Sequence, residues 1–219
     1  MPAQKKKKLR RLLLKTAMLP LSLVFALLLA EGILCLVEPK PDVPVALYYT
    51  YDAQLGWKKK PNLHKTIATV EYTVHQQTNS QGFLGPEVDF HKPQDTLRVL
   101  MLGDSFTEGY TVEYDENVSQ VLQQEFNGMS QSPVYQVINL GVGAYSTDQE
   151  LLVFQDTGKA YCPDVTELMF YHNDVWGNNQ PRCSNGAYKP MFEFDESGIN
   201  LGHVPVPAVY YQPAAAMRG

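Results

Sequence analysis

Leu97-Arg-Val-Leu-Met-Leu-Gly-Asp-Ser105 is the stretch of sequence that decides the fold. Its apolar residues, from Leu97 to Leu102, form a short run bounded by turn-forming residues, which is typical of a strand buried on both faces. Gly103 ends the run, and Asp104 and Ser105 follow directly. Strands buried on both faces belong to parallel sheets covered by helices, so this stretch predicts an α/β domain.

The residues that follow repeat the alternation of helix and strand. Apolar residues at a period near 3.6 predict the first helix, which Asn127-Gly128 is expected to end, and a capping box opens the second helix. The helices are expected at 118–126 and from Thr147-Asp-Gln-Glu150, and the further strands at 134–139 and 165–171. This order predicts a parallel sheet with right-handed crossovers, whereas Gly, Asn and Pro after Trp176 predict irregular structure.

The N-terminal sequence predicts a membrane anchor. Seven of the 18 Lys and Arg residues lie at or before Lys15, and an apolar run from Thr16 to Val37 follows, interrupted by Glu31. A run of about 20 apolar residues can cross a bilayer, and the basic head is expected to stay in the cytoplasm. No cleavage site follows the run, which favours a retained anchor. We expect a single-pass protein of the inner (cytoplasmic) membrane, with its catalytic domain periplasmic or extracellular.

The composition predicts four regions. Residues 1–37 form the basic head and transmembrane anchor, and residues 38–47 form a stiff Pro-rich spacer. Residues 48–93 are rich in Thr, Tyr and Val and predict a small β-rich leader, in which Lys58-Lys-Lys60 reads as a solvated loop. Residues 94–219 hold the main domain.

Charge and cysteine usage exclude several classes of function. Beyond Lys15 the chain has 11 basic against 23 acidic residues, which argues against a nucleic-acid partner. Neither Cys-x-x-Cys nor His-Glu-x-x-His occurs, so no metal is expected, and no organic cofactor is implied. A disulfide between Cys162 and Cys183 is allowed outside the cytoplasm, but their spacing does not decide it.

Polar clusters follow each of the three expected strands. They are Gly103–Gly109, Asn139–Ala144 and His172–Asp174. The carboxyl ends of parallel strands meet at one edge of a sheet, where α/β proteins bind ligands. A serine on a tight turn between strand and helix exposes its Oγ, so Ser105 is a candidate nucleophile. Backbone amides near Gly143 and the side chain of Asn173 are candidate oxyanion donors.

These clusters resemble a known family. Gly103-Asp-Ser105, Asn139-x-Gly141-x-Gly143 and Asn173-Asp174 are similar, in order and spacing, to the first three blocks of the SGNH (GDSL) hydrolases. The resemblance covers residues 97–174, and the anchor and Thr78–Phe83 resemble the membrane-tethered bacterial branch. It implies a flavodoxin-like three-layer α/β/α sandwich and a serine esterase acting on an acyl ester, with acylated glycans among the candidate substrates. Ser105 would be the nucleophile, and Gly143, Ala144 and Asn173 would be oxyanion donors.

The sequence departs from the family at three places. Ala144 and Tyr171 stand where relatives usually have glycine. Ala144 keeps an N–H and is expected to donate it, provided that its backbone does not demand a positive φ. The family takes its acid and base from a late Asp-x-x-His block, and the later Asp195 and His203 do not have this spacing. We therefore expect that the sequence stops before this block and that the chain alone has little or no turnover, because a serine without a base is a poor nucleophile. His172 reads as a loop histidine rather than the base.

Other functions remain open at this stage. A membrane-tethered O-acyltransferase for exported polysaccharide would use the same serine and oxyanion donors. An incomplete triad also suits a non-catalytic glycan-binding or scaffold protein. Dinucleotide binding at Gly141-Val-Gly-Ala-Tyr-Ser146 is a weaker alternative, because its third small residue is a serine and no acidic residue stands at the end of an expected strand about 20 positions on. Asp104 is expected to hydrogen-bond the turn backbone rather than to act as a catalytic acid.

Overall fold

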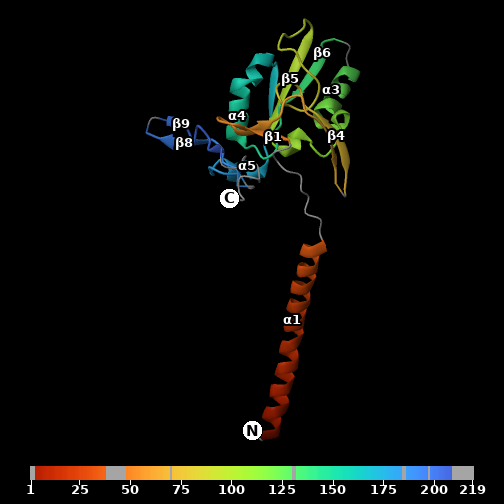
Figure 1. Cartoon of the computed structure of the whole chain (residues 1–219), viewed down its shortest axis with the longest axis vertical. Helices are drawn as coiled ribbons and strands as arrows, with labels where there is room; N and C mark the ends of the chain where they lie inside the picture. The colour runs from red at the N-terminus through yellow and green to blue at the C-terminus, as the bar shows by residue number, and fades with distance from the viewer. Residues whose placement is uncertain are drawn as a thin grey trace, which may run out of the picture. The chain divides into compact units, whose positions relative to one another are not determined.

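A computed structural model describes residues 3–37, 48–69, 71–129, 132–183, 186–196 and 198–208, with side chains of the first helix described for 16–33. The chain divides into two compact units, Met1–Val43 and Pro44–Gly219. Figure 1 shows the long helix of the first unit and the mixed α/β body of the second. The predicted spacer, residues 38–47, lies outside the described residues.

The first unit is one helix, α1 (Ala3–Val37). Within it, Thr16–Ile33 has a mean hydropathy of 1.9, and all of its described side chains are exposed, including Glu31. It is the one helix in the described part of the chain that is long and apolar enough to cross a membrane. The expectation of an N-terminal apolar helix is therefore confirmed by its length and composition.

A parallel three-stranded sheet forms the centre of the second unit. Its middle strand is β5 (Thr96–Gly103), with β6 (Val134–Asn139) on one side and β7 (Val165–Met169) on the other. Val99 is opposite Val137 in β6 and Val165 in β7. The prediction of an α/β domain with a parallel sheet is confirmed, although the third strand ends at Met169 rather than Tyr171.

The residues of β5 alternate between two packed faces. Val99 and Met101 join a cluster that Leu122 and Phe126 of α3 (Val118–Met129) cover, whereas Leu100 and Leu102 join one that includes Val153 of α4 (Thr147–Asp156). Successive side chains of a strand point to opposite faces, so the two helices cover opposite sides of the sheet. Figure 1 shows α3 and α4 on either side of β5.

The ends of both helices differ from the predictions. α3 continues through Asn127 and Gly128 to Met129, and Gly128 does not have the positive φ of a glycine that ends a helix. α4 has Ser146 as its N-cap, and the Ser146 N–H donates to Oε1 of Gln149 over 3.3 Å. The capping interaction is therefore one residue earlier than the expected Thr147-to-Glu150 box.

The leader region contains two antiparallel hairpins. The strands are β1 (Tyr49–Asp52), β2 (Gly56–Lys59), β3 (His64–Ala68) and β4 (Thr73–Gln77). Trp57 and Phe83 are buried in the same cluster as Leu100 of β5. The leader therefore shares the core of the main sheet rather than forming a separate domain.

The region after the third strand is more regular than predicted. α5 (His172–Gly177) follows β7, and β8 (Met191–Asp195) pairs with β9 (Gly198–Gly202). The expectation of irregular structure is wrong here, because these two strands pair in register from Met191 opposite Gly202 to Asp195 opposite Gly198. Three short helical turns complete the described elements: α2 (Ser105–Glu108), η2 (Tyr114–Glu116) and η3 (Gly158–Tyr161).

The two cysteines beyond the anchor differ in their environment. Cys162 is exposed and Cys183 is buried, and no disulfide joins them. Cys183 belongs to the core cluster around Trp57.

Candidate functional site

Ser105 lies on the turn between β5 and α2. Oδ1 of Asp104 accepts a hydrogen bond of 2.9 Å from the Phe106 N–H and so caps the helix, as the sequence predicted. Gly103 is required, because a Cβ there would lie 2.0 Å from Oγ1 of Thr107. Ser105 is partly exposed, and its hydroxyl makes no hydrogen bond to the described residues. The turn therefore presents an accessible serine at the end of the central strand.

The three sequence clusters come together at this serine. Nδ2 of Asn173 donates to Oδ2 of Asp104 over 3.0 Å, which ties the end of β7 to the turn after β5. A Cβ placed on Gly143 would lie 3.9 Å from Cβ of Ser105, so the loop after β6 passes directly beside the serine. Ser105, Gly143 and Asn173 thus share one edge of the sheet.

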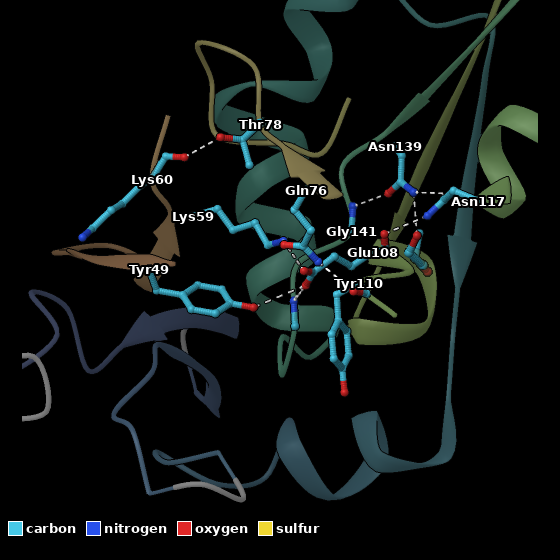
Figure 2. A network of polar contacts seen from close by, with 12 residues as sticks. Tyr49, Lys59, Lys60, Gln76, Thr78, Glu108, Tyr110, Asn117, Asn139 and Gly141 are labelled. Atoms are coloured by element: carbon cyan, nitrogen blue, oxygen red, sulfur yellow. Dashed lines mark hydrogen bonds and ion pairs between the residues drawn. The ribbon is translucent and has the colours of Figure 1, made fainter. Parts of the chain in front are cut away.

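Asn139 fixes the loop after β6 against α2 (Figure 2). Its Nδ2 donates to the Thr107 carbonyl and, over 3.0 Å, to Oδ1 of Asn117, while its Oδ1 accepts from the Gly141 N–H over 2.8 Å. A Cβ on Gly141 would lie 2.4 Å from the Glu108 nitrogen, so the close approach of the two turns requires glycine there.

A buried carboxylate lies between the leader and this loop. Glu108 is 1% exposed; its carboxylate is ion-paired with Lys59 of β2 and accepts the Gly143 N–H. Oε1 of Gln76 lies 3.3 Å from Nζ of Lys59, and the Tyr49 hydroxyl lies 3.4 Å from Oε2 of Glu108. Figure 2 shows Lys59 and Gln76 extending toward Glu108 from the leader strands.

The interpretation of Lys58-Lys-Lys60 as a solvated loop is wrong for Lys59, which is 2% exposed. Lys59 lies in β2 two residues after the buried Trp57, so it shares the buried face of the strand while Lys58 points to solvent.

Two backbone amides beside the serine are directed at no described group. They are the N–H groups of Ser105 and Ala144, whereas the Gly143 N–H is already bonded to Glu108. The condition set for Ala144 from the sequence is not met, because Ala144 has φ 64°, a left-handed conformation that glycine adopts more readily. Its N–H is nevertheless present beside the serine. Oδ1 of Asn173 is buried without a hydrogen-bond partner among the described residues.

Several carboxyl groups lie beneath the site. Burial, reinforced by Asp174, Asp104 and Asp148, raises the pKa of Glu150 to about 8. Burial also raises the pKa of Asp174, against the opposing effect of the hydrogen bond from the Tyr171 N–H. No group of three or more His, Cys, Asp or Glu side chains suited to a metal ion occurs among the described residues.

The described histidines do not act on Ser105 in this structure. His172 is exposed and packs edge-on against Tyr171, with ring centroids 4.3 Å apart. Nε2 of His203 lies 3.3 Å from Oε1 of Glu193 on the β8–β9 hairpin. No hydrogen bond joins Ser105 to a histidine within the described ranges, so the role of base is unfilled there.

Aromatic side chains form a rim next to the serine. Phe106 is 66% exposed and packs on Tyr171, with ring centroids 4.5 Å apart. Large exposed apolar side chains beside a polar site often mark a binding surface.

The sequence matches no protein-family model and no curated protein sequence. The functional reading therefore depends on the site itself. The sequence patterns point to Ser105, the Gly143–Ala144 turn and Asn173, but they indicate no role for Glu108, Lys59 and Trp57.

The burial of Trp57 and Lys59 could have been predicted from the period-2 alternation of β2, which places both residues on one face of the strand.

Proposed function

We propose that this chain is a membrane-tethered serine ester hydrolase of the SGNH type, with the flavodoxin-like three-layer fold of that family. Ser105 attacks the ester carbonyl, and the alcohol leaves from the resulting tetrahedral intermediate. Water then releases the acyl group from the serine. The apolar helix at Thr16–Ile33 would hold the domain at the outer face of the cytoplasmic membrane.

One observation carries the proposal: the residues after three different strands converge on one accessible serine. The Asn173–Asp104 hydrogen bond of 3.0 Å and the approach of Gly143 to Ser105 bring the three clusters together. A serine at a strand–helix turn, with unused amides beside it, is the arrangement that acyl transfer requires.

One of the three oxyanion donors expected from the sequence, the Gly143 N–H, already has a hydrogen-bond partner. The Gly143 N–H is bonded to Glu108, so we assign the oxyanion to the N–H groups of Ser105 and Ala144 and to the side-chain amide of Asn173. Asn173 has a second N–H beyond the one that it donates to Asp104. The left-handed φ of Ala144 is part of the turn that presents its N–H.

Two related functions use the same surface. An O-acyltransferase for exported polysaccharide differs only in that a sugar hydroxyl replaces water. The exposed Phe106–Tyr171 pair favours a sugar-binding role as a second candidate, because aromatic faces pack on the apolar faces of sugar rings. In that case Ser105 would be dispensable.

The test is hydrolysis of p-nitrophenyl acetate by the full chain in detergent micelles, with and without added imidazole. Imidazole supplies a base that the described residues do not provide, and Ser105→Ala in the same buffer measures the background. Imidazole-dependent turnover that Ser105→Ala loses supports the esterase. Equal rates in both proteins, together with retention on acetylated polysaccharide, would overturn it in favour of the binding protein.

A further inference from the structure

The peptide group between Gly143 and Ala144 is held from the leader. Nε1 of Trp57, in β2, donates to the Gly143 carbonyl oxygen over 3.1 Å. Trp57 is 3% exposed and belongs to the core that the leader shares with the sheet. The indole is therefore fixed by packing before it reaches the loop.

The carbonyl of Gly143 and the N–H of Ala144 belong to the same planar peptide group and point in opposite directions. A donor that fixes the carbonyl oxygen therefore also fixes the direction of the Ala144 N–H. Because hydrogen bonds in a chain polarise one another, the indole also strengthens that N–H as a donor.

The preceding peptide group is held as well. The Gly143 N–H donates to Glu108, whose carboxylate is ion-paired with Lys59, two residues after Trp57 on the same strand. The side chains of Lys59 and Glu108 are 2% and 0% exposed. A Cβ on Gly143 would lie 2.8 Å from the Tyr49 hydroxyl, so the leader leaves little room for this turn to shift.

We infer that Trp57 is a positioning residue for the oxyanion donor, acting through the Gly143–Ala144 peptide group, with Lys59 and Glu108 holding the peptide group before it. The leader is thereby part of the catalytic apparatus rather than a spacer. This inference rests on the proposed esterase function. It assigns no chemical step to Trp57, which touches neither the serine nor the reacting atoms.

The test compares Trp57→Phe with Tyr145→Phe in the imidazole-supported assay. The two rings pack edge to face with centroids 5.5 Å apart, and the Tyr145 hydroxyl donates to the Trp57 carbonyl. Both variants thus remove a hydrogen bond from the same core, but only Trp57→Phe removes one from the Gly143–Ala144 peptide group. Replacement of Trp57 by β-(3-benzothienyl)alanine removes the N–H while keeping the ring shape, in case the phenylalanine variant folds poorly.

We expect either Trp57 replacement to lower kcat about tenfold with KM within about twofold, less than the 10²–10³-fold that follows complete loss of an oxyanion donor. Tyr145→Phe should keep kcat. Affinity for phenylboronic acid, which forms a tetrahedral adduct on a serine, should fall in parallel with kcat.

Two outcomes would overturn the inference separately. If the wild type has Ser105-dependent activity and the Trp57 replacements match Tyr145→Phe in kcat and boronate affinity, the positioning role is wrong and the esterase stands. If the wild type has no Ser105-dependent activity, the proposed function fails, and the positioning role fails with it.

Discussion

The side-chain amide of Asn173 donates to the carboxylate of Asp104 across 3.0 Å. This hydrogen bond links the segment after β7 to the segment after β5, and Asp104 directly precedes the serine. Asp104 in turn caps α2 through the Phe106 N–H. One carboxylate therefore orients both the nucleophile turn and the amide that we assign to the oxyanion.

Asn173→Ala should lower the Ser105-dependent rate of ester hydrolysis by about 10²–10³-fold, the usual effect of losing one oxyanion donor. Asn179→Ala is the matched control, because Asn179 is exposed and, among the residues that the structure describes, its Nδ2 bonds only the Val175 carbonyl, over 2.8 Å. Steady-state kinetics on p-nitrophenyl acetate measure both. Equal rates in the two variants would contradict the assignment of Asn173.

Ala144→Gly should stabilise the protein by about 1 kcal/mol, because Ala144 has φ 64° and glycine removes the steric cost of that conformation. The reverse change, Gly186→Ala, should destabilise it by a similar amount, since Gly186 has φ 86° and a Cβ there would meet nothing within 4 Å. Thermal unfolding followed by circular dichroism measures both. A loss of stability in Ala144→Gly would show that the methyl group packs favourably enough to outweigh the strain.

The parts of the fold that depend on local pattern were predictable from the sequence. β5 and β6 have continuous apolar or alternating runs, and their bounds match the predicted ones to within a residue or so. The β8–β9 hairpin was not predicted, because its strands are short and largely exposed and thus carry no burial pattern.

The residues of the candidate site could be predicted only where a sequence motif follows a predicted strand. Ser105 and Asn173 follow strands and were found on that basis. Glu108 and Lys59 are 49 positions apart in the sequence and form an ion pair. The pair is buried because the leader packs on the sheet. Composition alone does not predict this burial, because Lys59 lies in a run of three lysines and differs from Lys58 and Lys60 only by its position in the alternation of the strand.

Glu150→Gln should remove a pH dependence of stability. The pKa of Glu150 is raised from 4.5 to about 8 by burial and by Asp174, Asp104 and Asp148. Between these two values the folded state holds a proton that the unfolded state has lost, so stability falls as pH rises from about 4.5 to about 8 and is flat with respect to this group above that range. Below about pH 4.5 both states are protonated, and the stabilising contribution is complete.

Glutamine imitates the protonated carboxyl, so Glu150→Gln should exceed the wild type in stability at pH 9 by on the order of 4 kcal/mol and match it near pH 4. Urea unfolding at several pH values measures the difference. Glu167→Gln, at an exposed carboxyl on β7, is the control and should leave the pH profile unchanged. Parallel pH profiles for Glu150→Gln and the wild type would contradict a neutral, buried Glu150.

Lys189→Met should be strongly destabilising, by about 3–5 kcal/mol, because it leaves a buried carboxylate without its partner. The ammonium of Lys189 is ion-paired with Asp148, and the two side chains are 0% and 3% exposed. The same ammonium donates to the carbonyls of Gly177 and Pro190, each over 3.1 Å, so it also joins the end of α5 to the segment before β8. Burial already raises the pKa of Asp148 against the opposing charge of Lys189, and removing that charge should raise the pKa further.

A double variant separates the unpaired charge from the lost packing. Lys189→Met combined with Asp148→Leu should recover part of the loss, since no charge then remains buried. Lys92→Met is the matched control at an ion pair near the surface, because Lys92 and Asp164 are 24% and 39% exposed, and it should cost less than about 1 kcal/mol. Urea unfolding at pH 7 gives all three values. If Lys189→Met lowers the free energy of unfolding by no more than Lys92→Met, the Lys189–Asp148 pair does not stabilise this part of the fold. The Asp148 carboxyl is then neutral in the Lys189→Met variant.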